Sequence, residues 1–240
     1  MTRRALDAYY TPDALADLRC CSAEDLIASL APGSVDGVIA DPPWSYNNVG
    51  AEGSASALYG TDPDCWIASV LDSSFPVAAP ASYLAVWCTW PKLAEWFAVH
   101  GSMRWRYVTG GAWAKSNGFG VGFHHAGDSE FWLLYVKGSP RPADGRQTNA
   151  IHAPRLGHSE KPQAALDVLV KTVAPVGGLI LDPFAGESAS LARCCARLGR
   201  RYVGAEIDPE RHQRALRRLA GESAAQSRMV GQGSMFMGAL

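Results

Sequence analysis

Residues 179–188 read LILDPFAGES, and this stretch decides the fold class. An apolar strand is expected over Leu179–Asp182, followed by a tight turn and a helix over Ser188–Leu198. Open α/β sheets bind their ligands beside the carboxyl ends of such strands. Gly186 allows a close backbone approach at the turn, and the helix start offers N–H groups to an anion. The stretch therefore predicts an α/β sheet with a ligand beside Asp182.

A second strand with an acidic end follows in RYVGAEIDPE, residues 201–210. Its last residue, Glu206, comes about twenty residues after Gly186, the spacing at which doubly wound folds place an acid on a ribose hydroxyl. The turn lacks the G-x-G-x-x-G fingerprint, so a dinucleotide is not indicated. Asp208 is equally well explained as the N-cap of a helix over Pro209–Leu219. The two strand ends together favour a ligand of the nucleotide type.

The rest of the chain alternates short apolar runs with helical patterns, which is typical of a sheet covered by helices on both faces. We expect one domain over residues 1–220, active-site or target loops over 45–61 and 138–159, and a flexible tail over 221–240. Seven strands are predicted at Asp17–Cys21, Val35–Asp41, Tyr83–Trp87, Arg106–Lys115, Glu130–Lys137, Leu179–Asp182 and Arg201–Glu206, and six helices at Ala23–Leu30, Pro63–Leu71, Lys92–His100, Pro162–Val173, Ser188–Leu198 and Pro209–Leu219.

The composition narrows the class of protein. The 240 residues are 48% hydrophobic and 19% charged, with a formal net charge of −1. These values exclude a disordered chain and argue against coating nucleic acid by bulk charge. The six cysteines show neither C-x-x-C nor zinc spacing, so reduced thiols are expected. With no signal-peptide core and no apolar stretch long enough for a membrane, the sequence predicts a soluble, intracellular, cytoplasmic protein.

The motif Asp41-Pro42-Pro43-Trp44 follows the apolar run VDGVIA. A carboxylate there lies at the ligand-binding crevice of the sheet. The prolines have no N–H, so nearby carbonyls remain able to accept from a ligand amine, and the indole offers a flat stacking face. These features predict a clamp for a planar heterocycle, in which Asp41 and a backbone carbonyl accept the two N–H bonds of its amino group. The alternative is a strand-ending turn with a buried tryptophan.

The motif HSEKP starts at His158 and precedes the helix predicted over Pro162–Val173. Helix capping explains Ser159, and Pro162 suits the first helical turn. Capping does not explain His158 and Lys161. These two side chains are therefore expected to face a ligand carboxylate.

With these segments in this order, the chain resembles the β-type, circularly permuted S-adenosylmethionine-dependent amino-methyltransferases. In that family a D-P-P-[YW] catalytic motif precedes an H-x-x-x-K-P segment and a D-P-F-x-G cofactor motif, as at 41–44, 158–162 and 182–186 here. YLAVWCTW, AWAKSN and EFWLLYVKGSP are similar to the mRNA adenosine methyltransferase branch and its bacterial and phage relatives, whereas DPFAG is similar to DNA adenine methyltransferases. The resemblance implies a Rossmann-like methyltransferase fold with a seven-stranded, mostly parallel sheet, one antiparallel strand and permuted motif order.

The resemblance also implies the cofactor, S-adenosylmethionine, which leaves as S-adenosylhomocysteine, with no metal. Two departures stand out. Glu187-Ser188-Ala189 stands in place of the usual glycine-serine-glycine, so the contacts to the cofactor carboxylate are expected to differ from those of typical relatives. Ser22 stands where many relatives carry an aspartate that binds the cofactor's adenine. The expected catalytic residues are Asp41, Pro42, Pro43 and Trp44, and the expected cofactor-binding residues are Ser22, Asp41, His158, Lys161, Pro162, Asp182, Pro183, Phe184, Gly186, Glu206, Ile207 and Asp208.

Contacts with nucleic acid are expected in the loops that flank the cleft. The arginines between 193 and 218 are at least as well explained by a solvated helix face paired with acids as by a phosphate-binding patch. His124-His125 is not expected to bind a metal. The residues predicted to contact nucleic acid are Lys115, Arg141, Arg146, Asn149 and Arg155.

The leading prediction is a site-specific DNA methyltransferase, of bacterial or phage origin, that acts on adenine N6. Its partner would be a duplex with a flipped adenine, or single-stranded DNA. An adenosine N6-methyltransferase acting on RNA stays open, as does a catalytically silent nucleic-acid-binding subunit. A homodimer or an accessory subunit is also open, and no membrane partner is expected. Cytosine N4 methylation is disfavoured because those relatives usually carry serine at the position of Asp41.

Overall fold

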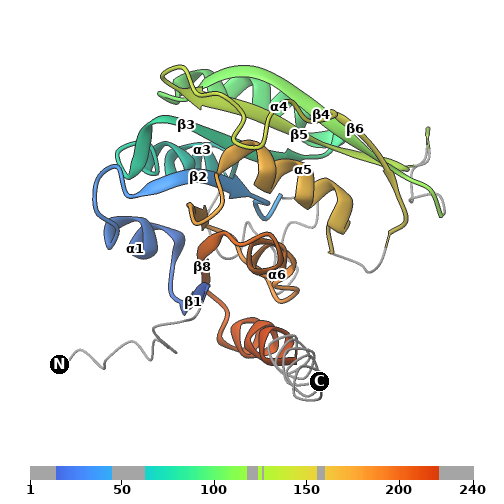
Figure 1. The fold of residues 1–240 in the computed structure, drawn as a ribbon. Coiled ribbons are helices and arrows are strands. Elements are labelled where there is room, and N and C mark those ends of the chain that lie inside the picture. Colours follow the sequence, from blue (N-terminus) through green and yellow to red (C-terminus); the bar gives the residue numbers. More distant parts are fainter. Residues whose placement is uncertain (1–14, 45–62, 118–123, 126, 156–159, 222–240) are drawn as a thin grey trace, which may run out of the picture.

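The architecture of the computed structural model is one eight-stranded sheet with helices on both faces (Figure 1). The structure describes residues 15–44, 63–117, 124–125, 127–155 and 160–221. The predicted loop 45–61 and the tail from 222 onward lie outside these residues. The strand order is β1-β8-β7-β2-β3-β5-β4-β6. The strands are β1 (Ala16–Cys20), β2 (Val35–Ala40), β3 (Ala78–Cys88), β4 (Arg106–Lys115), β5 (Ser129–Lys137), β6 (Ala150–Ala153), β7 (Leu179–Asp182) and β8 (Arg201–Glu206).

Five neighbouring strands, β1, β8, β7, β2 and β3, run parallel. Only β5 among the described strands opposes its neighbours, because it pairs antiparallel with both β3 and β4, while β6 is parallel to β4. The mostly parallel Rossmann-like sheet with one antiparallel strand is therefore confirmed. In the parallel part, every strand ends at the same edge of the sheet. That edge is where an α/β fold places its ligand.

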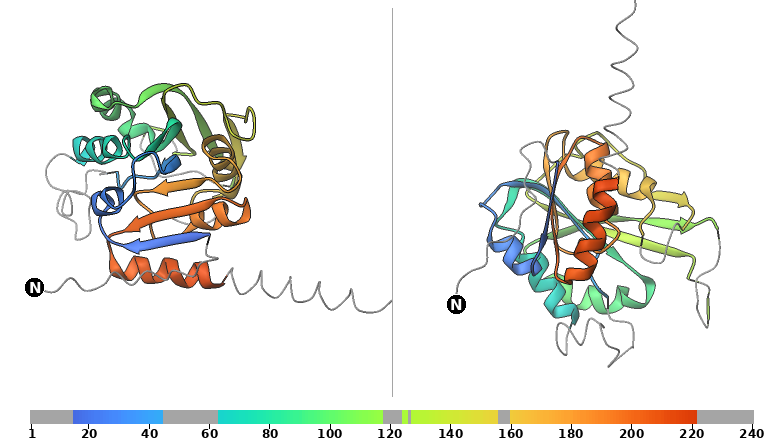
Figure 2. Two further views of the ribbon diagram at one scale, coloured as in Figure 1. Left: turned by 60° about the vertical axis from the view of Figure 1, so that its left-hand side comes forward. Right: turned by 90° about the horizontal axis from the view of Figure 1, so that it is seen from below.

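The helices divide the core into two layers, one on each face of the sheet (Figure 2). One layer packs under α5 and α6, and the other packs under α1, α3 and α4. A further helix over 209–221 joins the first layer through Ala215. None of the described helices is long and apolar enough to cross a membrane. The named helices are α1 (Ala23–Ala28), α3 (Pro63–Ser73), α4 (Trp90–Val99), η1 (His100–Ser102), α5 (Gln163–Val173) and α6 (Ser190–Arg197).

The predicted number of strands, seven, was wrong by one. The eighth, β6, lies inside the segment predicted as a loop over 138–159 and pairs with β4 at the sheet edge. Its four residues, AIHA, are too few to show an alternating pattern, and three of them are not buried. Hydrogen bonding to a strand already in place creates this element, so only the assembled sheet reveals it.

Candidate active site

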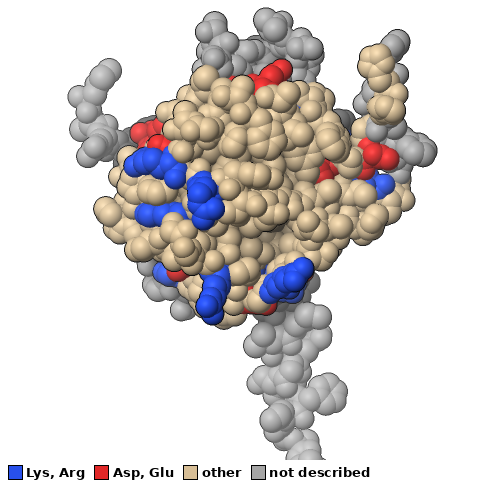
Figure 3. Space-filling model, turned by 90° about the horizontal axis from the view of Figure 1, so that it is seen from above, with Lys and Arg blue, Asp and Glu red and all other residues tan. Residues whose placement is uncertain are grey.

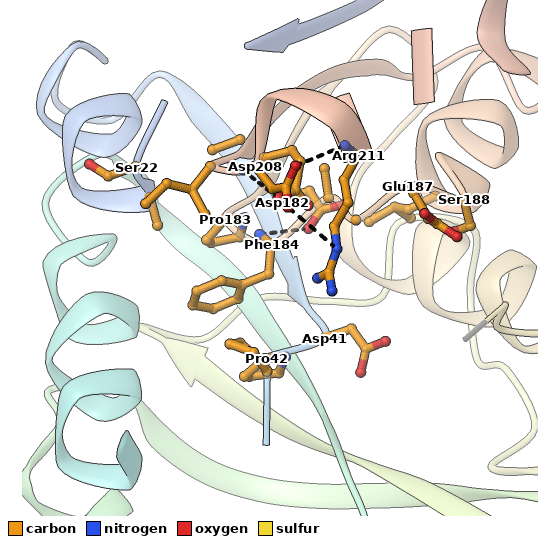
Figure 4. Close-up of a pocket in the computed structure, with 18 of the residues that line it drawn as sticks. Ser22, Asp41, Pro42, Asp182, Pro183, Phe184, Glu187, Ser188, Asp208 and Arg211 are labelled. Carbon is orange, nitrogen blue, oxygen red and sulfur yellow. Dashed lines mark hydrogen bonds and ion pairs between the residues drawn. The ribbon is translucent and has the colours of Figure 1, made fainter. Parts of the chain in front are cut away.

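Two acidic strand ends meet above the middle of the sheet. β2 and β7 are parallel neighbours, so Asp41, directly after β2, and Asp182, the last residue of β7, lie at the same edge. Both line one cavity of about 810 Å³ and approach it from neighbouring strands (Figure 4). Around them the cavity is lined by Cys21, Ser22, Ala23, Glu24, Ile39, Pro42, Pro43, Trp66, Trp87, Lys161, Leu166, Pro183, Phe184, Ala185, Gly186, Glu187, Ser188, Ser190, Leu191, Ala205, Glu206, Ile207, Asp208, Pro209, Glu210 and Arg211.

Two carboxylates of the cavity wall are buried. Asp182 is 4% exposed and Glu206, the last residue of β8, is 8% exposed. Burial raises the pKa of Asp182 to about 7, although hydrogen bonds from Tyr202 Oη and the Phe184 N–H lower it. Burial also raises the pKa of Glu206, against the hydrogen bond that its Oε1 accepts from Asp208 N–H at 2.8 Å. The wall is thus acidic, and it favours a ligand with positive charge and hydroxyl donors.

The turn after β7 contains two residues in the left-handed backbone region, of which only one is a glycine. Gly186 has φ +63°, and Ala189, the N-cap of α6, has φ 49° and ψ 26°. Ala189 is the only described residue other than glycine with positive φ, and it is 1% exposed. Between them Glu187 pairs with Arg214 at 2.6 Å. The Glu187-Ser188-Ala189 segment thus places a paired carboxylate at the cavity lining and a left-handed alanine at the start of α6.

The D-P-P-W motif is held rigidly. Trp44 N–H donates to the Pro42 carbonyl at 2.9 Å, and its indole N–H donates to the Trp87 carbonyl at 3.0 Å. The Trp44 ring packs edge-on against Trp96, with centroids 5.3 Å apart. Trp44 is not among the residues that line the cavity, whereas Asp41, Pro42 and Pro43 are. The partly buried indole therefore helps to hold the turn, while the carboxylate and prolines face the cavity.

A chain of four alternating charges holds Asp41. Lys161 Nζ lies 2.9 Å from Asp41 Oδ2 and 3.0 Å from Glu130 Oε2, and Lys115 Nζ lies 2.9 Å from Glu130 Oε1. Three of these side chains, those of Lys161, Glu130 and Lys115, are less than 20% exposed. Lys161 also lies over the ring of Trp87, 5.1 Å from its centroid. This chain of charges links the end of β2, β4, β5 and the start of α5.

The charges of this chain set one another's protonation. Burial raises the pKa of Asp41, and the ammonium of Lys161 opposes that rise. Burial alone would lower the pKa of Lys161, but the carboxylates of Asp41 and Glu130 outweigh it and raise that pKa. Burial would raise the pKa of Glu130, but the two lysines beside it lower it. At neutral pH Lys161 is thus a fixed cation between two acceptors, and Asp41 keeps a carboxylate oxygen directed to the cavity.

Most of the predicted cofactor residues converge on the cavity. Ser22 lines it and also caps α1, because its Oγ accepts from Asp25 N–H at 3.0 Å. Pro162 is buried and is absent from the lining. His158 lies outside the described residues. The predicted residues that line the cavity are Ser22, Asp41, Lys161, Asp182, Pro183, Phe184, Gly186, Glu206, Ile207 and Asp208.

The predicted nucleic-acid residues do not gather in one place. Backbone N–H groups of Ala143 and Asp144 donate to the carbonyls of Thr172 and Lys171, at the far end of α5 from Lys161. Since α5 has eleven residues, that end is roughly 16 Å away. The exposed Arg141 and Arg146 flank this anchored segment, so the structure places them at the opposite edge of the sheet from the site.

The other three predicted contacts lie along β4 and β6. Lys115 is 11% exposed and paired with Glu130, so it belongs to the buried charge chain. Arg155 lies beyond the end of β6 that faces Lys115, where its backbone N–H donates to Asn117 Oδ1 at 2.6 Å. Asn149 is exposed, and its side chain donates to the Gly110 carbonyl at 3.3 Å. Among the five residues predicted to contact nucleic acid, Arg155 is exposed and lies at the edge of the sheet that carries the site.

The arginines of the last helices are largely paired. Arg193 pairs with Glu160, Arg197 with Asp167, and Arg214 with Glu187 and Glu210. On the other side of the molecule, the face seen from above, which carries α4, β4 and β5, shows Lys and Arg in small groups separated by uncharged surface (Figure 3). His124 and His125 are exposed, and no group of three or more metal-ligating side chains occurs in the described part of the chain. The solvated-face interpretation therefore explains most of the arginine cluster.

Sequence reasoning missed Glu130, Trp87 and Tyr202. Glu130 lies at the start of the otherwise buried strand FWLLYV, and a carboxylate at the end of such a strand is a signal for a paired or functional acid. Trp87 is buried under Lys161, and Tyr202 reaches Asp182 from the neighbouring strand. No local pattern marks these two, because their partners are distant in the sequence.

Comparison with known proteins agrees with this geometry. Residues 129–217 match the model of the family N6_N4_Mtase, described as DNA methylase. The protein YubD of Escherichia coli (strain K12), a methylase by its name, is 24% identical over 221 residues, which cover 88% of this chain and 93% of YubD. The matched residues contain Glu130, Lys161 and the whole D-P-F-A-G turn.

Three solved structures share the fold. The M1.HpyAVI complex with SAM is 18% identical, with a TM-score of 0.66, covering 85% of this chain and 99% of that one. TTHA0409 of Thermus thermophilus, a DNA modification methylase by its name, is 20% identical in its S-adenosyl-L-methionine complex, with a TM-score of 0.66 and 85% and 93% coverage. The cytosine-N4-specific PvuII DNA methyltransferase is 11% identical, with a TM-score of 0.68 and 85% and 86% coverage.

These likenesses agree with the order of the motifs along the chain. The D-P-P-W segment follows β2 and the D-P-F-A-G segment follows β7, and both open onto one cavity. The family match covers the second of these segments. Residues 129–217 thus match the N6/N4 DNA methylase family, and the motif order and the fold agree with that match.

Proposed function

We propose that this protein transfers a methyl group from S-adenosylmethionine to the 6-amino group of adenine in DNA. The observation that carries the proposal is the meeting of Asp41 and the D-P-F-A-G turn at a single cavity. One side of the cavity then holds a nucleotide-like cofactor, and the other presents a hydrogen-bond acceptor for a nucleobase amine. The family supports the reaction class.

The cavity fits S-adenosylmethionine in size and chemistry. Its volume of about 810 Å³ lies within the range of small-molecule sites, roughly 300–1,000 Å³. Glu206 is placed to accept from ribose hydroxyls, and Asp182 gives a carboxylate for a cationic group. Phe184, Ile207 and Trp66 supply apolar surface for a heterocycle. When bound, the cofactor supplies an electrophilic methyl group on a sulfonium.

The chain's own residues hold and orient the amine. Asp41 accepts one N–H of the exocyclic amino group, and the carbonyl of Pro42 accepts the other through the lone pair that Trp44 N–H leaves unused. These acceptors draw electron density onto the nitrogen and direct its lone pair, so catalysis here is positioning and electrostatics. Lys161 opposes the rise that burial causes in the pKa of Asp41, and its ion pair orients the carboxylate. A base in a duplex must first flip out of the stack.

Adenine is proposed over cytosine because of Asp41. The resemblance to related enzymes associates aspartate at this position with adenine and serine with cytosine N4. The fold does not discriminate, since the PvuII enzyme that shares it is cytosine-N4-specific.

The deciding experiment is to incubate the protein with methyl-labelled cofactor in three separate reactions. One contains duplex DNA of mixed sequence, one contains single-stranded DNA and one contains RNA. Mass spectrometry of the digested product then identifies the methylated nucleoside. N6-methyldeoxyadenosine from DNA is the expected product. N4-methyldeoxycytidine would overturn the choice of base, and label only in RNA would overturn the choice of substrate. Cofactor binding without transfer to any substrate would instead indicate a silent subunit.

A further inference from the structure

Tyr202 is a buried phenol beside the cavity to which the proposed reaction assigns no role. It lies on β8, is 2% exposed, and donates its hydroxyl hydrogen to Asp182 Oδ2 at 3.0 Å. The other oxygen, Asp182 Oδ1, accepts from the Phe184 N–H at 3.1 Å. Two donors from different elements therefore fix both oxygens of a carboxylate at the cavity wall.

The sheet makes this contact only because residue 204 is glycine. In the pairing of β7 with β8, Asp182 lies opposite Gly204, and Tyr202 lies opposite Ile180. The tyrosine side chain thus extends along its own strand, over Gly204, to reach Asp182. A Cβ at position 204 would lie 2.1 Å from Tyr202 Oη and 2.6 Å from its Cζ. Any side chain there would displace the ring from Asp182.

The groups around Asp182 favour its neutral form, and the hydrogen bond from Tyr202 opposes them. Asp41, Glu206 and the buried thiol of Cys195 lie close enough to interact with it electrostatically. Burial, followed by the charges of Asp41 and Glu206, raises the pKa of Asp182 to about 7. The Tyr202 hydroxyl and the Phe184 N–H are the groups that oppose this rise. Without the hydroxyl, the neutral acid would predominate at neutral pH.

We propose that Tyr202 is a positioning residue of the cofactor pocket, which holds Asp182 ionised and directed into the cavity, so that the pocket retains a cationic methionine-type ligand. Gly204 is required as well, because a side chain at this position would occupy the space of the Tyr202 ring. The inference rests on the proposed function for the identity of the ligand. The coupling of Tyr202 to Asp182 is a property of the chain alone and is measurable without any ligand.

The test is Tyr202→Phe, which removes one oxygen. In the protein without cofactor, NMR of carboxyl-labelled aspartate should show the Asp182 titration near pH 7 and an upward displacement of about one pH unit in the variant. Calorimetry should then show S-adenosylmethionine binding about fivefold weaker at pH 7 and near wild-type at pH 9, as expected for a one-unit displacement. The kcat at saturating cofactor should stay within about twofold, since Tyr202 touches no reacting group.

Matched variants distinguish a specific effect of Tyr202 on Asp182 from a general loss of structure. Tyr83→Phe removes another nearly buried hydroxyl, which donates to the Pro140 carbonyl at 3.1 Å, and should leave both readouts unchanged. Asp182→Asn should weaken binding and abolish its pH dependence near 7, and adding Tyr202→Phe should then cost no further affinity. Gly204→Ala should reproduce the Tyr202→Phe titration.

An Asp182 titration that is unchanged in Tyr202→Phe would overturn the inference. So would a binding profile that still depends on pH near 7 in Asp182→Asn. If the wild-type protein binds no S-adenosylmethionine at any pH, the proposed function fails. The NMR titration would then still decide whether Tyr202 governs Asp182.

Discussion

Ala189 carries backbone strain at a position where the family usually has glycine. Its φ of 49° and ψ of 26° put an L-residue in the left-handed region, which costs about 1–2 kcal/mol. The neighbouring Gly186, with φ +63°, adopts a similar conformation without a Cβ penalty. Core packing compensates at Ala189, which is 1% exposed against the α6 face. The turn therefore adopts this conformation at a cost in stability.

Replacing Ala189 with glycine should not lower the free energy of unfolding, because relief of about 1–2 kcal/mol of strain offsets the buried methyl group and the chain entropy that are lost. Urea denaturation measures the change. Ala192→Gly, in the buried interior of α6, is the matched control and should lower stability by about 1 kcal/mol instead. A loss of stability at both sites would show that the left-handed backbone carries no strain.

At Asp41 the expected effect is on chemistry and not on binding. Asp41→Asn keeps the shape of the side chain but removes the charged acceptor, so the methyl-transfer rate should fall by about 10²–10³-fold. Calorimetry should show cofactor affinity within about threefold of wild type, since the contacts of Asp182 and Glu206 remain. Asp25→Asn, in the first turn of α1, is the surface control. Wild-type methylation by Asp41→Asn would remove this residue from the mechanism.

At the scale of elements, the buried charge chain holds the antiparallel half of the sheet to the parallel half. Asp41 follows β2, Lys161 precedes α5, and Glu130 and Lys115 face each other from β5 and β4. A buried pair contributes little net stability when intact, but breaking it leaves an uncompensated charge. Glu130 is the link that both lysines share.

Glu130→Gln should therefore lower the free energy of unfolding by about 3 kcal/mol, because Lys115 and Lys161 lose their common counter-charge. Methylation should fall as well, since Lys161 is then drawn onto Asp41 and competes with the substrate amine. Glu95→Gln is the comparison: Glu95 pairs with Lys92 but is 56% exposed, and exposed pairs are worth about 0–1 kcal/mol. Equal effects from the two substitutions in urea denaturation would refute the special role of Glu130.

At the scale of the whole molecule, the net charge of −1 and the paired arginines restrict DNA binding to local contacts. Arg200 illustrates how basic residues are used structurally: it is 2% exposed and donates to Ala174 O, Leu198 O and Asp144 Oδ2. This anchors the segment around Asp144 at the edge away from the cavity. Of the predicted nucleic-acid residues, Arg155 is an exposed cation on the site edge.

DNA affinity should accordingly be weak and should fall with salt at a slope of about −3, as expected for contacts with about three phosphates. Fluorescence anisotropy with a short duplex over a series of salt concentrations measures the slope. Arg155→Ala should reduce its magnitude by about 1, whereas Arg146→Ala, at the opposite edge, should leave it unchanged. Tight binding that persists at high salt would contradict this picture.

Local sequence patterns were sufficient to predict the fold class, and most of the residues that they assigned to the cofactor line one cavity. Strand ends such as Asp182 and Glu206 are visible because apolar runs and turn residues are local signals, and parallel strands bring their carboxyl ends together. The motif order indicated the reaction class, and Asp41 indicated the nucleobase that we propose. Boundaries were less exact: α4 begins at Trp90 rather than at Lys92.

The side chains that hold the site together could be identified only in the assembled fold. Glu130 and Lys115 meet Lys161 across the sheet, Tyr202 reaches Asp182 over Gly204, and the predicted contacts Arg141 and Arg146 lie far from the cavity. The physical reason is range. Hydrophobic period and turn chemistry act over a few residues, whereas ion pairs and buried hydrogen bonds form between groups that are adjacent only once the strands have assembled.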